Sequence, residues 1–370
     1  MVAPDNRKRT LMVMKRFLLA VVVVGSCFFA TCRSQNTATI DSARMLMLDG
    51  MRRSGIPGAS VTVMKHGKII WSEGLGFSDV ENRVPVTPQT KFRVGSVSKP
   101  LTAAALALLV EQGKLDLDAP VQRYVPSFPQ KKYPITTREL GGHLAGVRHY
   151  AGNEFLNQRH YNTVTDGLTI FKDDTLLFKP GDRYSYSSYG WNLISAVIEG
   201  ASGESFLALM RKRVFDAIGM THTAAEYTDS IIPFRAHFYS RSDSAAPVVN
   251  APFVDNSYKW AGGGFLSTTE DLVLFGQTML LGTFVRPHTR ELLWTSQRTT
   301  DGKQTGYGIG WSVVIDSSKH RIVSHSGGSV GGTAWLQIFP DQQLVAAFLF
   351  NGDGRQPSVR RIADMFLRSE

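Results

Sequence analysis

Two side chains that could activate each other stand three positions apart in the stretch GSVSKP. They are Ser96 and Lys99, and Pro100 follows them directly. Because proline lacks an N–H and is tolerated only near a helix start, we expect a helix to begin within about one turn of Ser96. Residues three apart share a helix face, so the hydroxyl and the amine should lie side by side. A neutral lysine there can take the serine proton and create a nucleophile for acyl transfer.

The predicted helix start also bears on the charge of the amine. A helix dipole places about half a positive charge at the N-terminus, which disfavours an ammonium and favours a neutral Lys99. The alternative interpretation is a capping serine beside a solvated lysine, because Ser-x-x-Lys spacing also arises by chance. The pair alone therefore does not establish a nucleophile.

The elements that would position this pair can be predicted from hydrophobic patterns. Leu101–Glu111 is apolar almost all round and predicts a buried helix that ends at Gly113. Trp191–Glu199 has apolar residues at helical spacing, and Ser267–Glu270 fits a capping box that opens another helix. No strong period runs from about residue 225 to 262, so we expect long loops there.

Strand patterns gather at both ends of the body of the chain. Ala59–Lys65 and Ile69–Gly76 form a hairpin pattern around His66-Gly67, after a predicted helix over Thr39–Arg53. Four further runs predict strands and a fifth predicts a closing helix: Tyr307–Ile315, His320–His325, Thr333–Phe339, Leu344–Asn351 and Ser358–Leu367. Strands at both ends with helices between them favour an α/β (α+β) fold in which both termini build one sheet.

Length and composition exclude several classes of protein. The chain has 370 residues, of which 43% are hydrophobic and 19% charged, with 34 Gly and 16 Pro. This composition excludes collagen-like, coiled-coil and wholly disordered chains. The formal net charge is +10, but five positive charges and one negative charge precede residue 27. No basic run remains in the body, so we do not expect nucleic-acid binding.

The first 32 residues have the pattern of a targeting segment. Lys15 and Arg16 precede the apolar run Phe17–Val24, and small residues then lead to Cys27, which is the order of a secretory signal. The apolar run is shorter than the roughly 20 helical residues that cross a bilayer. The letters VGSC resemble a bacterial lipobox, so lipidation of Cys27 and ordinary cleavage near Ala30 both stay open.

We therefore expect an exported protein of the periplasm or cell envelope, anchored to a membrane if Cys27 is lipidated. Residues 1–32 would be the signal segment and 33–370 one domain, with 100–285 largely helical. Cys32 is the other cysteine and also lies in the signal segment. The body therefore has no thiol nucleophile, no disulfide and no cysteine metal site.

Two further segments strengthen the case for the serine–lysine pair. Tyr186-Ser187-Ser188 precedes the Trp191 helix, and His325-Ser326-Gly327 follows a predicted strand. With Ser-x-x-Lys first and these two segments after it, the chain resembles the serine β-lactamase and penicillin-binding-protein superfamily, in its class C-like branch. The resemblance spans about residues 40–368. Three segments especially resemble a mitochondrial branch and its bacterial relatives: Thr136–Leu140, His143–Tyr150 and Tyr186–Gly190.

The resemblance implies a β-lactamase/transpeptidase-like fold for the domain, with an antiparallel sheet, and a role for each matched residue. Ser96 would be the nucleophile, and Lys99 would assist its deprotonation. Tyr186 would relay the proton during acylation and deacylation. His325 would take the third-motif position on a strand beside the cleft. No cofactor is implied, and no metal is expected because the nine histidines form no recognised ligand set.

The resemblance also implies the groups that hold the substrate. Backbone N–H groups of Ser96 and Gly328 would form the oxyanion hole, next to Gly327. Such donors contribute about 3–4 kcal/mol each to lowering the barrier. Ser188 stands where the family has Asn, and a hydroxyl reaches less far than an amide. His325 replaces Lys, which weakens the positive charge that would hold a substrate carboxylate at neutral pH.

Other patterns have structural interpretations. Gly327–Gly331 matches the Gly-x-Ser-x-Gly nucleophile elbow, but a predicted strand follows Ser329 where that motif needs a helix. His143 fits a structural histidine that bonds backbone. Arg148–Tyr150 fits a solvated loop better than a cleft wall. Gly262–Gly264 fits either a close approach beside the cleft or a structural loop.

Two functions follow from these observations. The first is an exported serine hydrolase that acts through an acyl-enzyme on a small-molecule or peptide substrate, either an amide or an ester. The two departures favour a D-amino-acid peptidase or an esterase over an efficient β-lactamase. The second is a catalytically silent protein of the same fold that binds or self-assembles, because the mitochondrial branch assembles into filaments.

Overall fold

The computed structural model describes residues 37–243 and 245–368. The predicted signal segment, with its lipobox at Cys27, lies outside these residues and stays a prediction. A first helix covers residues 37–54. The strands are β1 (Gly58–Lys65), β2 (Lys68–Asp79), β3 (Val84–Pro85), β4 (Phe92–Arg93), β5 (Ala224–Ala225), β6 (Tyr239–Ser240), β7 (Val249–Asn250), β8 (Phe265–Ser267), β9 (Ser312–Ile315), β10 (Arg321–Ser329), β11 (Gly332–Phe339) and β12 (Leu344–Phe350).

The other helices fall mainly between β4 and β9. The α-helices are α2 (Ser98–Glu111), α3 (Thr137–Gly141), α4 (Val164–Leu168), α5 (Ser188–Ser202), α6 (Phe206–Leu209), α7 (Asp216–Ile218), α8 (Trp260–Gly263), α9 (Thr269–Leu281), α10 (Pro287–Trp294) and α11 (Val359–Leu367). The short turns are η1 (Gly95–Val97), η2 (Val121–Arg123), η3 (Glu154–Leu156) and η5 (Ser257–Lys259), with a π-helix η4 at Met210–Phe215.

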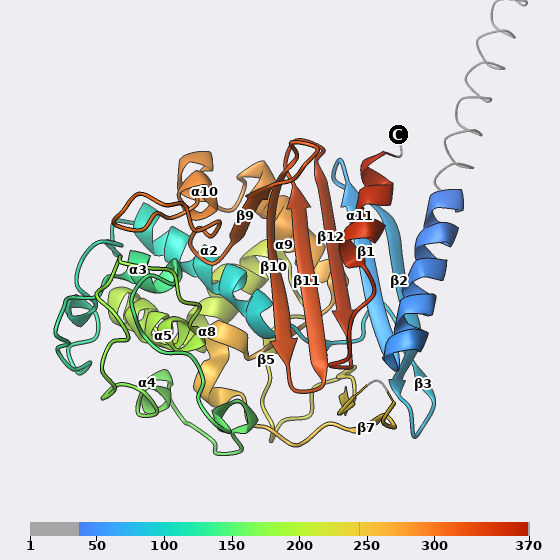
Figure 1. Ribbon diagram of the computed structural model, residues 1–370, viewed down its shortest axis with the longest axis horizontal. Coiled ribbons are helices and arrows are strands. Elements are labelled where there is room, and N and C mark those ends of the chain that lie inside the picture. The colour runs from blue at the N-terminus through green and yellow to red at the C-terminus, as the bar shows by residue number, and fades with distance from the viewer. Residues whose placement is uncertain (1–36, 244, 369–370) are drawn as a thin grey trace, which may run out of the picture.

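The main sheet joins the two ends of the described chain. It has seven strands in the order β3-β2-β1-β12-β11-β10-β9 (Figure 1). The central pairing is antiparallel and runs from Ala59 opposite Phe350 to Lys65 opposite Leu344. The expected sheet built from both termini is therefore confirmed, and the fold class with it.

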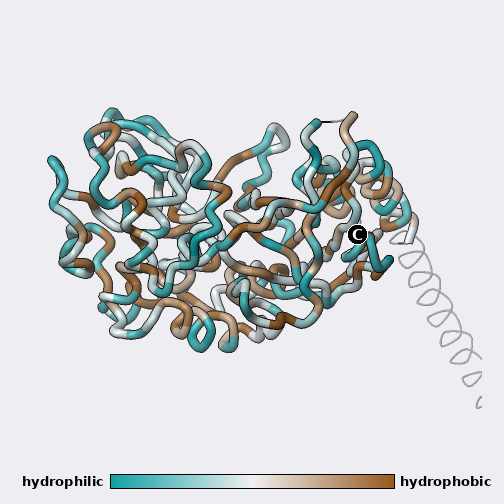
Figure 2. The backbone as a smooth tube through the Cα atoms, turned by 90° about the horizontal axis from the view of Figure 1, so that it is seen from below, coloured by the Kyte–Doolittle hydropathy of each residue, from teal (hydrophilic) through white to brown (hydrophobic). Residues whose placement is uncertain are grey.

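The two faces of the sheet pack against different helices. Along β12, Leu344, Ala346, Phe348 and Phe350 belong to one core with the 37–54 helix and α11. The alternate residues Val345, Ala347 and Leu349 belong to the core that contains α2 and α9. All seven are fully buried, which is the period-two pattern of a strand covered on both faces. In Figures 1 and 2 the C-terminal end lies beside the 37–54 helix.

Helix α2 lies in the middle of the second core. Its residues from Ser98 to Ala107 are all buried. It is apolar all round, as predicted, because it contacts α5, α8 and α10 on different sides. The chain then turns at Gly113, which has a φ of +67°. The residues at the N-terminal end of α2 are therefore held rigidly at the junction between the helices and the sheet.

Two predicted boundaries are wrong. The strand expected over Tyr307–Ile315 begins only at Ser312, because Gly306 and Gly310 have positive φ and the chain turns there. The helix expected to be capped by Ser267 is capped by Thr268, whose side chain accepts from the Asp271 N–H.

The remaining predictions of elements hold closely. The expected loops between about 225 and 262 contain short strands and turns. β10 continues past His325 to Ser329, so its last residues reach η1.

Among the described residues, no single helix is long and apolar enough to cross a membrane. The bent pair Ser188–Ser202 and Phe206–Ile218 would have the length and composition only together, across a 78° bend.

Candidate active site

Ser96 lies in the single turn η1, directly before α2. The preceding residue, Gly95, has a φ of +48°, a conformation that favours glycine. A Cβ at Gly95 would lie only 2.6 Å from the carbonyl oxygen of Gly328 on β10. Glycine at this position therefore lets the end of β10 approach the serine turn closely.

Lys99 is fully buried one turn along from the serine. Its Nζ lies 2.9 Å from Ser96 Oγ, 3.2 Å from Ser188 Oγ and 2.8 Å from the Gly262 carbonyl oxygen. The predicted side-by-side placement is confirmed. A neutral amine in this position can donate its two hydrogens to Gly262 and Ser188, and its lone pair then faces the Ser96 hydroxyl.

The surroundings of Lys99 favour that neutral form. Burial holds the pKa of Lys99 well below its usual range, and the positive charge of Lys259 lowers it further. The sequence prediction attributed a neutral amine to the helix dipole, whereas desolvation is the larger cause. The amine can therefore act as a base toward Ser96 near neutral pH.

Tyr186 lies beside the same pair. Lys99 Nζ lies 4.9 Å from the centroid of the Tyr186 ring. The Tyr186 ring packs against the His143 ring, and their centroids are 4.2 Å apart. Burial raises the pKa of Tyr186 above its usual value, and a hydrogen bond with Ser96 opposes this rise. The phenol is therefore protonated at neutral pH and can hand a proton to a leaving group.

The end of β10 forms the opposite side of the site. A Cβ at Gly327 would lie 2.0 Å from the Val94 carbonyl oxygen and 3.0 Å from the Ser96 nitrogen. β9 pairs with β10 only over Arg321–Ser324. The edge of β10 beyond Ser324 therefore lies against η1. This packing brings Gly328 beside Ser96, which is where the predicted oxyanion hole needs it.

His325 is on the same strand but is occupied elsewhere. Its Nε2 lies 2.7 Å from the Tyr307 hydroxyl and its Nδ1 2.6 Å from the Ser326 carbonyl oxygen. Because a carbonyl only accepts, Nδ1 carries the hydrogen and Nε2 accepts from Tyr307. Burial, as the largest cause, and the charge of Lys99 together lower the pKa of His325 to about 3. The third motif therefore supplies no positive charge, and a catalytic role for His325 stays a prediction.

These groups open onto one cavity of about 450 Å³. Its lining residues are Ser96, His149, Tyr150, Phe155, Tyr186, Ser188, Lys259, Gly262, Gly263, Gly328, Ser329, Thr333 and Asp353. Four predicted residues, Ser96, Tyr186, Ser188 and Gly328, line it directly. Lys99 reaches it from below through Ser96 and Ser188, whereas His325 and Gly327 are absent from the lining.

Several lining residues were not predicted as part of the site, and the polar ones His149, Tyr150 and Lys259 bear most directly on its chemistry. His149 and Tyr150 belong to the segment that the sequence analysis interpreted as a solvated loop. This interpretation is wrong for both residues, because both line the cavity. His149 Nδ1 accepts from the Ser188 N–H at 3.1 Å, and burial lowers the pKa of His149 to about 4. No sequence pattern marks Lys259, apart from its position three residues before Gly262, whose carbonyl oxygen accepts from Lys99.

Two structural interpretations from the sequence are confirmed. Ser329 ends β10, and β11 begins at Gly332, so the Gly-x-Ser-x-Gly match is a strand–turn–strand and not a nucleophile elbow. His143 Nδ1 accepts from the Ser187 N–H at 3.1 Å, which is a structural bond to backbone.

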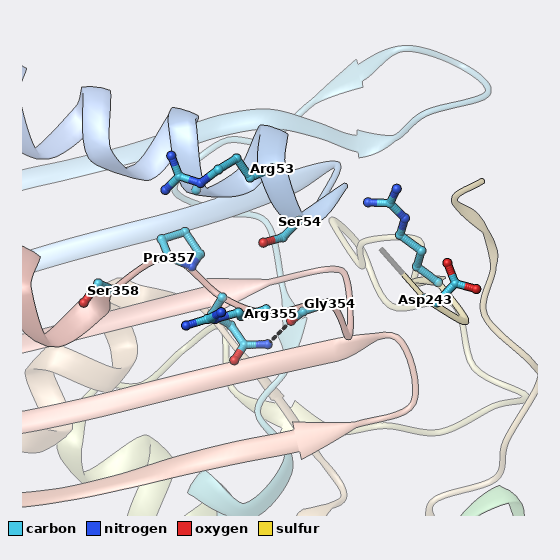
Figure 3. Close-up of a pocket in the computed structure, with 10 residues that line it drawn as sticks. Arg53, Ser54, Asp243, Gly354, Arg355, Pro357 and Ser358 are labelled. Carbon is cyan, nitrogen blue, oxygen red and sulfur yellow. Dashed lines mark hydrogen bonds between the residues drawn. The ribbon is translucent and has the colours of Figure 1, made fainter. Parts of the chain in front are cut away.

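A larger cavity of about 830 Å³ lies elsewhere, between the end of the 37–54 helix and the chain before α11 (Figure 3). Arg53, Arg241 and Arg355 line it together with Asp243. Its lining includes Ser54 and Ser358 but no lysine, histidine or tyrosine, so the serine–lysine–tyrosine set of the first cavity is not repeated there. The cavity at Ser96 is therefore the candidate active site.

Comparison with known proteins agrees with this geometry. The family model described as Beta-lactamase matches residues 44–367. The mitochondrial serine beta-lactamase-like protein LACTB of Homo sapiens is 35% identical over 398 aligned positions, which cover 82% of this chain and 72% of the relative.

Two solved structures have a similar fold. The octameric penicillin-binding protein homologue from Pyrococcus abyssi has a TM-score of 0.78 at 26% identity, over 89% of this chain and 77% of that one. The D-amino acid amidase from Ochrobactrum anthropi SV3, complexed with D-phenylalanine, has a TM-score of 0.77 at 21% identity, over 90% and 98%. The amidase likeness shows the fold alone. The chain belongs to the beta-lactamase family and is a serine hydrolase of this fold.

Proposed function

We propose that the protein forms an acyl-enzyme on Ser96 and hydrolyses amide or ester substrates. The single observation that carries this proposal is the 2.9 Å contact between Ser96 Oγ and the buried amine of Lys99, at the base of an open cavity. An amine without charge and a hydroxyl at hydrogen-bond distance are the two groups that nucleophilic catalysis requires.

Acylation would proceed as follows. Ser96 Oγ attacks the substrate carbonyl carbon while its proton passes to Lys99 Nζ. The oxyanion that forms accepts from the backbone N–H groups of Ser96 and Gly328. Tyr186 then gives its proton to the leaving amine or alkoxide and regains one from Lys99. The carbon–heteroatom bond breaks, and the acyl group stays on Ser96.

Deacylation reverses these roles. A water molecule attacks the acyl carbonyl carbon and gives a proton to the Tyr186 and Lys99 pair. Ser96 leaves with a proton from the same pair, and the product carboxylic acid departs. The raised pKa of Tyr186 keeps the phenol protonated between steps, so it serves as a relay and not as a standing base.

We infer that peptides with D-amino acids or simple esters are better substrates than β-lactams. The Ser188 hydroxyl accepts from Lys99 Nζ. The serine side chain is also shorter than the Asn that the family has at this position. His325 holds no charge toward the cleft. Both features weaken recognition of a β-lactam whose amide and carboxylate would bind on the side of the cleft where Ser188 and His325 lie. The D-amino acid amidase with a similar fold supports the first of the two substrate classes.

Intact-mass measurement tests the nucleophile. We expect a fluorophosphonate to add once to the wild-type protein and not to Ser96→Ala. Ser329→Ala is the matched control, because Ser329 also lines the cavity and its hydroxyl has no partner within the described residues. An adduct that persists in folded Ser96→Ala and is lost in Ser329→Ala would overturn the assignment.

A substrate panel then separates the classes. D-Ala-D-Ala peptides, p-nitrophenyl esters of graded length and a chromogenic cephalosporin would be compared by kcat/KM. We expect turnover of the peptides or esters to exceed that of the cephalosporin. The reverse order would make the protein a β-lactamase.

We also propose export, with the signal segment 1–32 as its support and lipidation of Cys27 as its more specific form. Fractionation of bacterial cells that express the full chain, with Cys27→Ala as the comparison, tests both. Loss of membrane association in the variant supports lipidation, and cytoplasmic wild-type protein refutes export.

Self-association is a further proposal, supported by the octameric relative. Light scattering on the wild type and Ser96→Ala would show whether assembly depends on catalysis. Esterase activity that is lost in Ser96→Ala while assembly is unchanged would support the enzyme, whereas assembly without activity in either protein would favour a scaffold.

A further inference from the structure

Lys259 is the charged group of the cavity that the mechanism above does not use as a reactant. It ends the turn η5 and is 2% exposed, and it lines the cavity with Ser96. Its Nζ lies over three aromatic rings, at 4.4 Å from the centroid of Phe155, 5.2 Å from Tyr258 and 5.6 Å from Tyr150. No hydrogen bond or ion pair joins this Nζ to another described residue.

A buried amine without an anionic partner is costly to charge. The carboxylates near Lys259 are already satisfied by other groups. Glu226 binds Arg93 Nε at 2.8 Å and also accepts from Asn256 Nδ2 at 2.6 Å. Asp353 accepts from Ser240 Oγ at 2.7 Å and from the Arg241 N–H at 3.2 Å. The aromatic faces offset part of the cost, but they leave the hydrogen-bond donors of Lys259 without acceptors.

Lys259 also lies close to the serine turn. The Cβ position at Gly263 is 3.8 Å from Lys259 Cδ and 3.7 Å from the carbonyl carbon of Gly95. The stem of the lysine and the backbone before Ser96 therefore flank the same glycine. A group bound by Lys259 would lie beside the scissile bond of a substrate held at Ser96.

The β10 side of the site supplies no positive charge, because His325 is neutral and bonded to Tyr307. We propose that Lys259 binds a carboxylate of the substrate, so that the enzyme selects acyl donors that carry a carboxylate next to the scissile bond. This inference rests on the proposed hydrolase function and names its substrate class. A charge-assisted hydrogen bond in a partly desolvated cavity supplies the selectivity.

The charge of Lys259 makes this selection depend on pH. Burial, as the largest cause, and the charge of Arg93 together lower the pKa of Lys259 to about 7, against an opposing effect of Glu226. His149 lines the same cavity and Lys99 lies beneath it; burial lowers the pKa of both side chains, to about 4 for His149. Carboxylate binding should therefore be tightest below about pH 7 and weaken as Lys259 loses its proton.

The test on turnover uses matched substrates. One pair places the carboxylate on the acyl side: p-nitrophenyl hydrogen glutarate against p-nitrophenyl pentanoate. The other places it on the leaving group: 4-carboxyphenyl butyrate against phenyl butyrate. We expect Lys259→Met to raise the KM of the anionic member of one pair about 10- to 100-fold relative to the KM of its neutral twin. Lys259→Arg should restore part of the loss, and the exposed Lys114→Met should have no effect.

A binding measurement on Ser96→Ala separates this inference from the proposed function, because it needs no turnover. Calorimetry at pH 6 should show that glutarate binds at least about tenfold more tightly than glutaramide. The preference should vanish in Ser96→Ala with Lys259→Met and decline by pH 9. Equal binding of the two probes, or equal effects of Lys259→Met on both members of each ester pair, would overturn the inference even if hydrolysis itself is confirmed.

Discussion

The Tyr307 hydroxyl donates to His325 Nε2 at 2.7 Å and so directs the third-motif imidazole away from the cavity. The other nitrogen, Nδ1, donates to the Ser326 carbonyl oxygen at 2.6 Å. Both ring nitrogens are thus used within the protein, and the side chain is 5% exposed. His325 therefore lies behind the cavity, bonded within the protein, and offers no positive charge to a substrate.

The neutral state of His325 predicts a pH dependence of stability. Its folded pKa is about 3 against an ordinary value of 6.5, so between these values the unfolded chain binds a proton that the folded chain does not. The free energy of unfolding should therefore fall as the pH drops from about 6.5, by up to about 1.4 kcal/mol per pH unit for this group. His325→Gln, which keeps an acceptor for Tyr307, should flatten the slope between pH 4 and 6.

Urea unfolding at a series of pH values measures this slope. The exposed His288→Gln is the control and should leave the slope as it is in the wild type. A slope that is the same in His325→Gln and the wild type would mean that the imidazole takes up a proton in the folded protein.

Replacement of Lys99 should separate activity from stability. Lys99→Met removes the base, so acylation should slow by about a thousandfold or more. The change relieves the desolvation of a buried amine but leaves the Gly262 carbonyl without its donor. These opposing terms are each about 1–3 kcal/mol, so the free energy of unfolding should change little. Fluorophosphonate labelling rates and thermal unfolding measure the two effects, and a variant that loses stability in parallel with activity would contradict the prediction.

The charge of Lys259 should also be visible in the pH profile of a neutral ester. A charged Lys259 disfavours a second charge on Lys99 and so lowers its pKa. The rate kcat/KM rises with pH as Lys99 loses its proton, because only the neutral amine is a base. Lys259→Met should raise the pKa of Lys99 and move this rise to higher pH. Lys259→Arg, which keeps the charge, should leave it near the wild-type position; a rise that stays in place in both variants would exclude the coupling.

The parts of the site that follow from local patterns were predictable. The spacing of Ser96, Lys99 and Pro100 determines a helix start and a shared face, and both hold in the structure. The sheet from both termini followed from short apolar, β-branched-rich runs, because strands buried on both faces appear in sequence as continuous apolar runs. Ser329 was excluded as a nucleophile for the same reason, since the strand after it was visible.

The remaining wall of the cavity was not predictable in this way. Lys259, His149 and Tyr150 lie in segments without a period, and their places depend on how long loops pack over α5 and η1. The neutral state of His325 depends on Tyr307, which stands in a turn that was predicted as a strand. Desolvation, the main cause of the low pKa of Lys99, is a property of the whole core and has no sequence pattern.

A pair of adjacent glycines gives the sharpest test of how the site is held together. A Cβ at Gly327 would lie 2.0 Å from the Val94 carbonyl oxygen, whereas a Cβ at Gly328 would meet nothing within 4 Å. Gly327→Ala should therefore push β10 away from η1, at a cost of about 1–3 kcal/mol in stability. A displacement of about 1 Å at Ser96 should slow acylation about a hundredfold. Gly328→Ala should stay within about 0.5 kcal/mol of the wild type. If urea unfolding and fluorophosphonate labelling find the two variants alike, the contact between β10 and the serine turn does not position the nucleophile.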